Sequence, residues 1–130
     1  MDKLNATQIC ALPLTTNAIV QLWVNWAIHS HQSFAVAKQL AINWNQRNQQ
    51  LRLGLMQIDL SEQAGEVWEA TLKWLESQTI PDSRQLMYCG AGPLLWIRDG
   101  TIENVVINPS STTLDNLMAM TERSFGASNA

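Results

Sequence analysis

The chain has 130 residues, a length typical of one domain that can bury a core without disulfide or metal support. Hydrophobic residues make up 46% of the chain and charged residues 15%, and the formal net charge is −3. No basic cluster is present to attract a phosphate backbone, which argues against a nucleic-acid partner.

Polar residues interrupt every apolar run well short of the roughly 18 residues that cross a bilayer. The start, Met1 to Asn5, lacks the basic and then apolar regions of a secretory signal. We therefore expect a cytoplasmic protein without a membrane partner. Cys10 and Cys89 fit no zinc or disulfide spacing, and in a reducing compartment we expect both to be buried thiols.

The first half of the chain has the order strand, helix, strand. An N-terminal element over residues 1–17 precedes Ala18 to Val24, an almost unbroken apolar run that predicts a strand buried on both faces. Apolar residues at three- and four-residue steps then predict a helix over residues 32–49. A second strand is expected over residues 51–60, parallel to the first because a helix connects them.

The second half begins with a helical stripe over residues 62–77, which Pro81 prevents from continuing. An extended loop is expected over residues 79–92. Asp99-Gly100 supplies the positive φ angles of a tight turn, so Pro93 to Arg98 and Thr101 to Ile107 predict an antiparallel hairpin. A last helix is expected from Thr112 or Thr113 to Gly126, followed by a frayed tail over residues 127–130.

Three segments carry recognisable motifs. The segments Val20-Gln21-Leu22-Trp23 and Trp26-Ala27-Ile28-His29-Ser30 are similar to V-D-F-W followed by W-C-G-P-C, and Gly92 to Gly100 is similar to I-P-T-L-L-L-F-K-N-G. In these motifs the chain resembles the thioredoxin family. The resemblance implies an α/β fold over residues 1–130, with a central mixed parallel and antiparallel sheet flanked by helices. It also places Gln21 in the core, at the position of the family's buried acid.

The family's two cysteines correspond to Ala27 and Ser30, so the dithiol that its reaction requires is missing. We therefore expect a redox-inactive protein that is not an enzyme and has no cofactor. The function this favours is a module that binds a protein or an extended peptide, of the assembly or chaperone type.

The resemblance also implies where a peptide would bind. In the family, the segment before a cis-proline offers its backbone groups to an extended substrate peptide, which is a form of strand addition. The expected wall consists of Trp26, Ala27, Ile28, His29, Ser30, Gly92 and Pro93, with a cis bond between Gly92 and Pro93. Cys89 could reach the rim of this wall as a lone thiol.

Other interpretations remain open. Ser30 could stabilise the thiolate of glutathione in a transferase-like enzyme, or the segment Ser61 to Gln78 could be the interface of a purely structural subunit. His29 and His31 would complete a four-ligand zinc set with Cys10 and Cys89, but no known zinc pattern has this spacing, and we expect no metal.

Six tryptophans are many for this length. We expect four in the core, Trp26 at the surface and Trp74 at the edge of its helical stripe, and an exposed tryptophan is a suitable binding anchor. The four expected in the core are Trp23, Trp44, Trp68 and Trp96.

Overall fold

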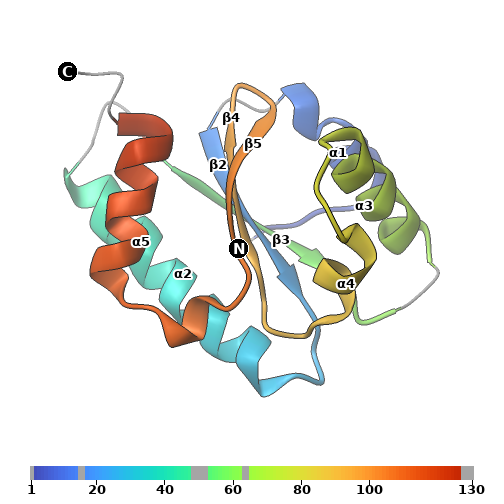
Figure 1. The fold of residues 1–130 in the computed structure, drawn as a ribbon, viewed down its shortest axis with the longest axis horizontal. Coiled ribbons are helices and arrows are strands. Elements are labelled where there is room, and N and C mark those ends of the chain that lie inside the picture. Colours follow the sequence, from blue (N-terminus) through green and yellow to red (C-terminus); the bar gives the residue numbers. More distant parts are fainter. Residues whose placement is uncertain (1, 15–16, 48–52, 63–64, 127–130) are drawn as a thin grey trace.

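The structure is a computed structural model that describes residues 2–14, 17–47, 53–62 and 65–126 (Figure 1). Helices and strands alternate through most of the chain, and short 3-10 turns follow α1 and precede α5. The elements are β1 (Asp2–Lys3), α1 (Ala6–Cys10), β2 (Asn17–Trp23), α2 (Ile28–Arg47), β3 (Gly54–Asp59), α3 (Glu66–Ser77), α4 (Ser83–Tyr88), β4 (Leu94–Arg98), β5 (Thr101–Val106) and α5 (Leu114–Thr121), which a π-helical turn (Glu122–Gly126) extends.

The strands form one mixed sheet in the order β1-β3-β2-β4-β5. β1, β3 and β2 are parallel, whereas β4 runs antiparallel to both β2 and β5. The sheet lies between two layers, with α2 and α5 on one face and α1, α3 and α4 on the other (Figure 1). This α/β architecture confirms the expected fold class.

Burial on both faces of the sheet explains the sequence of its central strands. Ala18, Ile19, Val20, Gln21 and Leu22 of β2 are all buried, as the apolar run predicts. One core cluster packs beneath α1 and α3 around Trp68, Trp74 and Leu75. The other packs beneath α2 and α5 around Trp44 and Trp96. The indole Nε1 of Trp96 donates to the Thr121 hydroxyl at 2.9 Å.

The hairpin between β4 and β5 forms as predicted. Asp99 and Gly100 have φ angles of 50° and 79°, the two positive values that this turn requires. A side chain at Gly100 would also collide with the backbone of Pro13, because its Cβ would lie 2.0 Å from the Pro13 carbonyl oxygen. Thr113 caps α5 by accepting from Asn116 N, which confirms one of the two expected caps.

Three predictions of element boundaries are wrong. The helix expected over residues 62–77 begins later, because α3 starts at Glu66. α2 begins at Ile28, earlier than the expected residue 32, so His29, Ser30 and His31 belong to its first turn. The segment 79–92, expected to be a loop, contains α4, whose Leu86 and Met87 are buried against the core. The predicted helix end at residue 49, the strand start at residues 51–52 and the tail over residues 127–130 fall outside the described parts of the chain.

Burial of the sulfur and indole side chains also differs from expectation. Cys10 and Cys89 are both exposed, because Ile9 of α1 and Leu86 and Met87 of α4 occupy the inward positions of those short helices. Trp74 is buried, and its Nε1 has no hydrogen-bond partner among the residues that the structure describes. Trp23 is half-buried at the end of β2 instead of lying in the core.

No helix over the described ranges is long and apolar enough to cross a membrane.

Candidate functional site

The loop after β2 and the first residue of α2 each present a large apolar side chain to solvent. Trp26 is 62% exposed and Ile28 is 65% exposed, while Ala27 between them is half-buried. A backbone hydrogen bond from Ser30 N to Ala27 O, 3.1 Å long, turns the chain into α2. The surface position of Trp26 agrees with the sequence prediction.

Ser30, at the position of the family's second cysteine, is completely buried and its hydroxyl is already engaged. Ser30 Oγ donates to Gly90 O at 2.9 Å and accepts from Val24 N at 3.3 Å. A hydroxyl that bonds two backbone groups and has no solvent access is unavailable to a ligand. Its environment does not favour a role in binding a glutathione thiolate.

Gln21 lies under Ser30 and is also completely buried, as the resemblance implies. Its amide Nε2 donates to Ser30 O at 2.9 Å, and its Oε1 accepts from Gln57 Nε2 at 3.0 Å. β2 and β3 pair Gln21 with Gln57 across the sheet. The network Gln57–Gln21–Ser30–Gly90 is therefore uncharged, and it connects β3 through β2 and α2 to the loop before β4.

The bond between Gly92 and Pro93 is trans, so the prediction of a cis bond is wrong. The chain turns before β4 by another means, since Gly90 and Gly92 both have φ near +70°. Glycine adopts this left-handed conformation without a steric penalty. Gly92 O accepts from Ser33 Oγ at 2.5 Å, and Pro93 O accepts from Leu22 N at 3.0 Å, so the carbonyl groups of both residues are hydrogen-bonded.

The expected groove is filled by the chain itself. Gly90 lies against the first residues of the site, since a Cβ there would be 3.2 Å from Ala27 Cβ and 3.5 Å from a ring carbon of Trp26. Gly92 and Pro93 are buried, and a Cβ on Gly92 would lie 2.7 Å from Ser33 Cβ. Of the seven residues expected to line the groove, the structure brings Trp26, Ile28 and His29 to the surface and buries Ser30, Gly92 and Pro93.

The two histidines at the start of α2 point to different partners. His29 Nδ1 lies 3.1 Å from Gln32 Oε1, whereas His31 Nε2 lies 2.9 Å from Asn25 O and its ring packs edge-on against Trp23. Among the residues that the structure describes, no three His, Cys, Asp or Glu side chains converge as a metal site.

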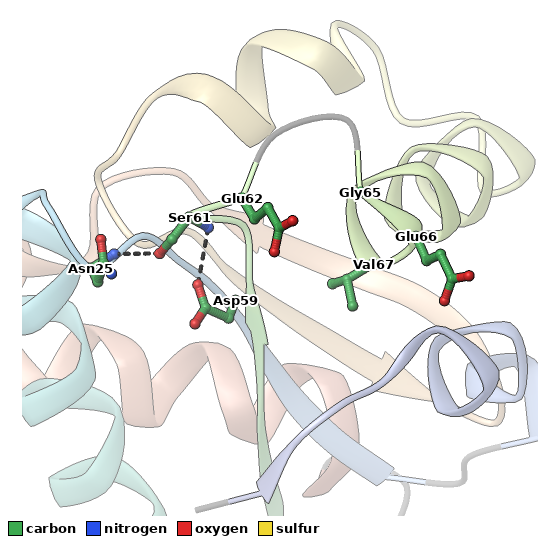
Figure 2. Close-up of a pocket in the computed structure, with 7 residues that line it drawn as sticks. All are labelled: Asn25, Asp59, Ser61, Glu62, Gly65, Glu66 and Val67. Atoms are coloured by element: carbon green, nitrogen blue, oxygen red, sulfur yellow. Dashed lines mark hydrogen bonds between the residues drawn. The ribbon is translucent and has the colours of Figure 1, made fainter.

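A second feature, which the sequence analysis missed, is an acidic hollow of about 790 Å³ beside the carboxyl ends of β2 and β3. Figure 2 shows the three carboxylates along it, Asp59, Glu62 and Glu66. Ser61 holds the rim together, accepting from Asn25 N at 2.7 Å and donating its N–H to Asp59 Oδ1 at 3.0 Å. The signal in the sequence was a group of acidic residues just after a strand in a parallel pair.

Asp59 is held in its charged form. Partial burial is the strongest single influence and raises the pKa of Asp59, but the hydrogen bonds from Ser61 and the ammonium of Lys3 together outweigh it and lower the pKa below the usual value. Lys3 Nζ lies 3.4 Å from Asp59 Oδ2 and also 4.6 Å from the ring centroid of Trp23. This charged cluster lies next to the uncharged network around Gln21.

Known proteins resemble the chain in structure but not in sequence. No family model matches it, and no curated protein does. The structure of the first two thioredoxin domains of Saccharomyces cerevisiae Eps1p superimposes on 95% of this chain with a TM-score of 0.61 and 12% sequence identity. The match spans 40% of that longer structure. Together with the mixed sheet and its two helical layers, this likeness identifies the fold of the chain as thioredoxin-like.

Proposed function

We propose that the protein is a redox-inactive, thioredoxin-like module that binds another protein or an extended peptide through Trp26 and Ile28. The observation that carries this proposal is the exposure of these two side chains, 62% and 65%, on either side of Ala27, which corresponds to the first cysteine of the thioredoxin motif. Tryptophan anchors are enriched among the residues that contribute most to binding energy at protein interfaces. An assembly or chaperone-type role in the cytoplasm remains part of the proposal.

The closed groove changes the expected mode of binding. Because Gly92 and Pro93 are buried, a partner cannot pair with the backbone before β4 in this conformation. We therefore favour side-chain contacts with Trp26 and Ile28 over strand addition. Tyr88, the last residue of α4, is 47% exposed and is a further large apolar side chain that is open to solvent.

The alternatives lack a supporting observation. The outward side of α3 carries Glu66, Glu69, Lys73 and Glu76, all exposed, so it does not offer the apolar surface of a permanent subunit interface. The engaged hydroxyl of Ser30 counts against a transferase-like role.

The binding proposal can be tested with matched isoleucine variants. A displayed library of random peptides would be selected on the wild-type protein, and the Kd of the selected peptides would then be measured for Trp26→Ala, Ile28→Ala and Ile42→Ala. Ile42 also lies on α2 and is 49% exposed, so it controls for the loss of an exposed apolar side chain.

We expect Trp26→Ala to weaken binding by about 30-fold, the loss typical of an interface hot spot. Ile28→Ala should weaken it less, and Ile42→Ala should leave it unchanged. Selection of no peptide, or equal losses for Ile28→Ala and Ile42→Ala, would contradict the proposal.

Redox inactivity needs a separate assay, because two exposed thiols, Cys10 and Cys89, remain. We expect the wild-type protein to reduce insulin no faster than the variant Cys10→Ser/Cys89→Ser. Faster turnover by the wild-type protein would reject the redox-inactive part of the proposal and leave the binding part to its own test.

A further inference from the structure

We infer that Gly90–Gly92 acts as a latch, which the hydroxyls of Ser30 and Ser33 hold closed over Ala27 and the start of α2. Both serines are completely buried, and they lie three residues apart, on one side of the helix. Ser30 Oγ donates to Gly90 O at 2.9 Å, and Ser33 Oγ donates to Gly92 O at 2.5 Å. Two side chains of α2 thus bind alternate carbonyls of the same short loop.

The loop is built to approach the helix through its backbone. Gly90 and Gly92 both have positive φ angles, and a Cβ on either residue would press against the α2 side, at 3.2 Å from Ala27 Cβ and 2.7 Å from Ser33 Cβ. The residue between them, Ala91, is half-buried. The segment therefore contributes little apolar burial of its own, and local segments of this kind open more readily than the core.

Both ends of the latch are fixed to the rest of the fold. Leu86 and Met87 of α4 are buried in the core on one side of the loop, and on the other side Pro93 O accepts from Leu22 N of β2 at 3.0 Å. Loss of the two serine hydrogen bonds would therefore free only the short connection between these anchors. Opening would uncover Ala27 beside Trp26 without unfolding the sheet.

If opening of the latch exposes Ala27 to a partner, the latch regulates binding, and that part of the inference rests on the proposed function. The closed state of the loop does not depend on the proposed function. The test therefore uses a reporter that requires no partner. In the background Cys10→Ser/Cys89→Ser, the substitution Ala27→Cys places a single thiol under Gly90, and its rate of reaction with iodoacetamide reports opening of the loop. The variants to compare in this background are Ser30→Ala/Ser33→Ala, Ser33→Ala and Gly92→Ala.

The control is Ser124→Ala. Ser124 is also buried, donates to Met120 O at 3.0 Å and accepts from Asn104 Nδ2 at 2.6 Å, so its loss removes hydrogen bonds of the same kind in another part of the molecule. Urea unfolding of every variant separates local opening from a change in global stability.

We expect Ser30→Ala/Ser33→Ala to react at least about tenfold faster than the control, under conditions where both are fully folded. Gly92→Ala should react faster as well, because its Cβ displaces the loop while both hydroxyls remain. If the double variant does not fold, Ser33→Ala and Gly92→Ala decide the question.

Labelling rates that follow global stability alone, or that match the control, would overturn the latch. The peptide-binding assay on the same variants distinguishes the two proposals. A faster-labelled variant in a protein that binds no peptide would support the latch and reject the proposed function. Unchanged labelling of the variants, in a protein that binds peptides, would reject the latch and support the proposed function.

Discussion

Two neighbouring pairs of residues on β2 and β3 face the same side of the sheet and have opposite chemistry. Gln21 pairs with Gln57, and two residues further along the strands Trp23 pairs with Asp59. The first pair is buried, and its hydrogen bonds join neutral amides and backbone groups. The second pair lies at the end of the strands, where Lys3 contacts both the indole ring and the carboxylate.

The difference follows from access to solvent. A buried charge without a partner is much less stable than a buried amide that forms its hydrogen bonds, whereas a charge at the rim keeps part of its hydration. Over two residues along β2 and β3, the protein therefore changes from a neutral to a charged network. The following substitutions test this comparison, beginning with the one that should have the largest effect.

The substitution Gln21→Asp would place a carboxyl in the uncharged network. Burial should raise the folded-state pKa of this carboxyl above its unfolded value of about 3.9. The loss of stability should therefore be complete above the folded-state pKa and should shrink as the pH falls through it. We expect a loss of about 3 to 5 kcal/mol at pH 8 and a smaller loss at pH 5, measured by urea unfolding.

Gln21→Asn is the matched control, because asparagine has the length of aspartate but no charge. Gln21→Asn should lower the free energy of unfolding by the same amount at pH 8 and pH 5. If Gln21→Asp also lowered it equally at both pH values, the carboxyl would not experience the desolvation that the buried position of Gln21 implies.

The second largest effect concerns the partner across the sheet. In Gln57→Leu, the Oε1 atom of Gln21 loses its donor, which should reduce the free energy of unfolding by about 1 to 3 kcal/mol. Replacing both residues with leucine removes donor and acceptor together. The double variant should therefore lose less stability than the sum of the two single variants, and simple additivity would show that the two amides are not coupled.

The sequence predicted the framework of this region well. The apolar run around Gln21 indicated a strand buried on both faces, and the resemblance to V-D-F-W identified the position as a core site. The Asp99-Gly100 turn was equally clear, because few residue pairs adopt two positive φ angles. These predictions depend on local pattern and survive any detail of packing.

The contacts between elements could not be predicted in the same way. That Gln57 would meet Gln21 depends on the register of β2 against β3, and that Ser30 and Ser33 would meet Gly90 and Gly92 depends on how α2 crosses the sheet. The trans bond before Pro93 was missed for a related reason. The corresponding bond is cis in the thioredoxin motif that the sequence resembles, but here two glycines make the turn.

Asp59→Asn should have a smaller effect than either change in the buried pair. Because the folded-state pKa of Asp59 is lowered, its stabilising contribution is present above the unfolded pKa of about 3.9 and is lost as the pH falls through the folded-state value. The side chain is 33% exposed, so solvent screening limits this contribution to about 1 kcal/mol or less at pH 7.

The measurement is the free energy of unfolding of wild type and Asp59→Asn from pH 7 down to pH 3. The difference between the two proteins should narrow below about pH 4, as the carboxyl of the wild type becomes protonated. A difference that stays constant over this range would mean that the charge of Asp59 contributes nothing.

Lys3→Met should have the smallest effect, because it removes the charge from the rim but keeps an apolar stem beside Trp23. The lysine side chain is 56% exposed, and an ion pair at such a position contributes about 0.5 kcal/mol and is screened by salt. The loss should therefore be measurable at low ionic strength and shrink in about 1 M NaCl. Lys38→Met provides the comparison, because the ammonium of Lys38 lies over an aromatic ring in the same way, 5.4 Å from the centroid of Phe34. A larger salt dependence of the stability loss for Lys3→Met than for Lys38→Met would assign the effect to the Lys3–Asp59 ion pair. An equal salt dependence would assign it to the aromatic contact and would mean that the ion pair contributes nothing to the charged network.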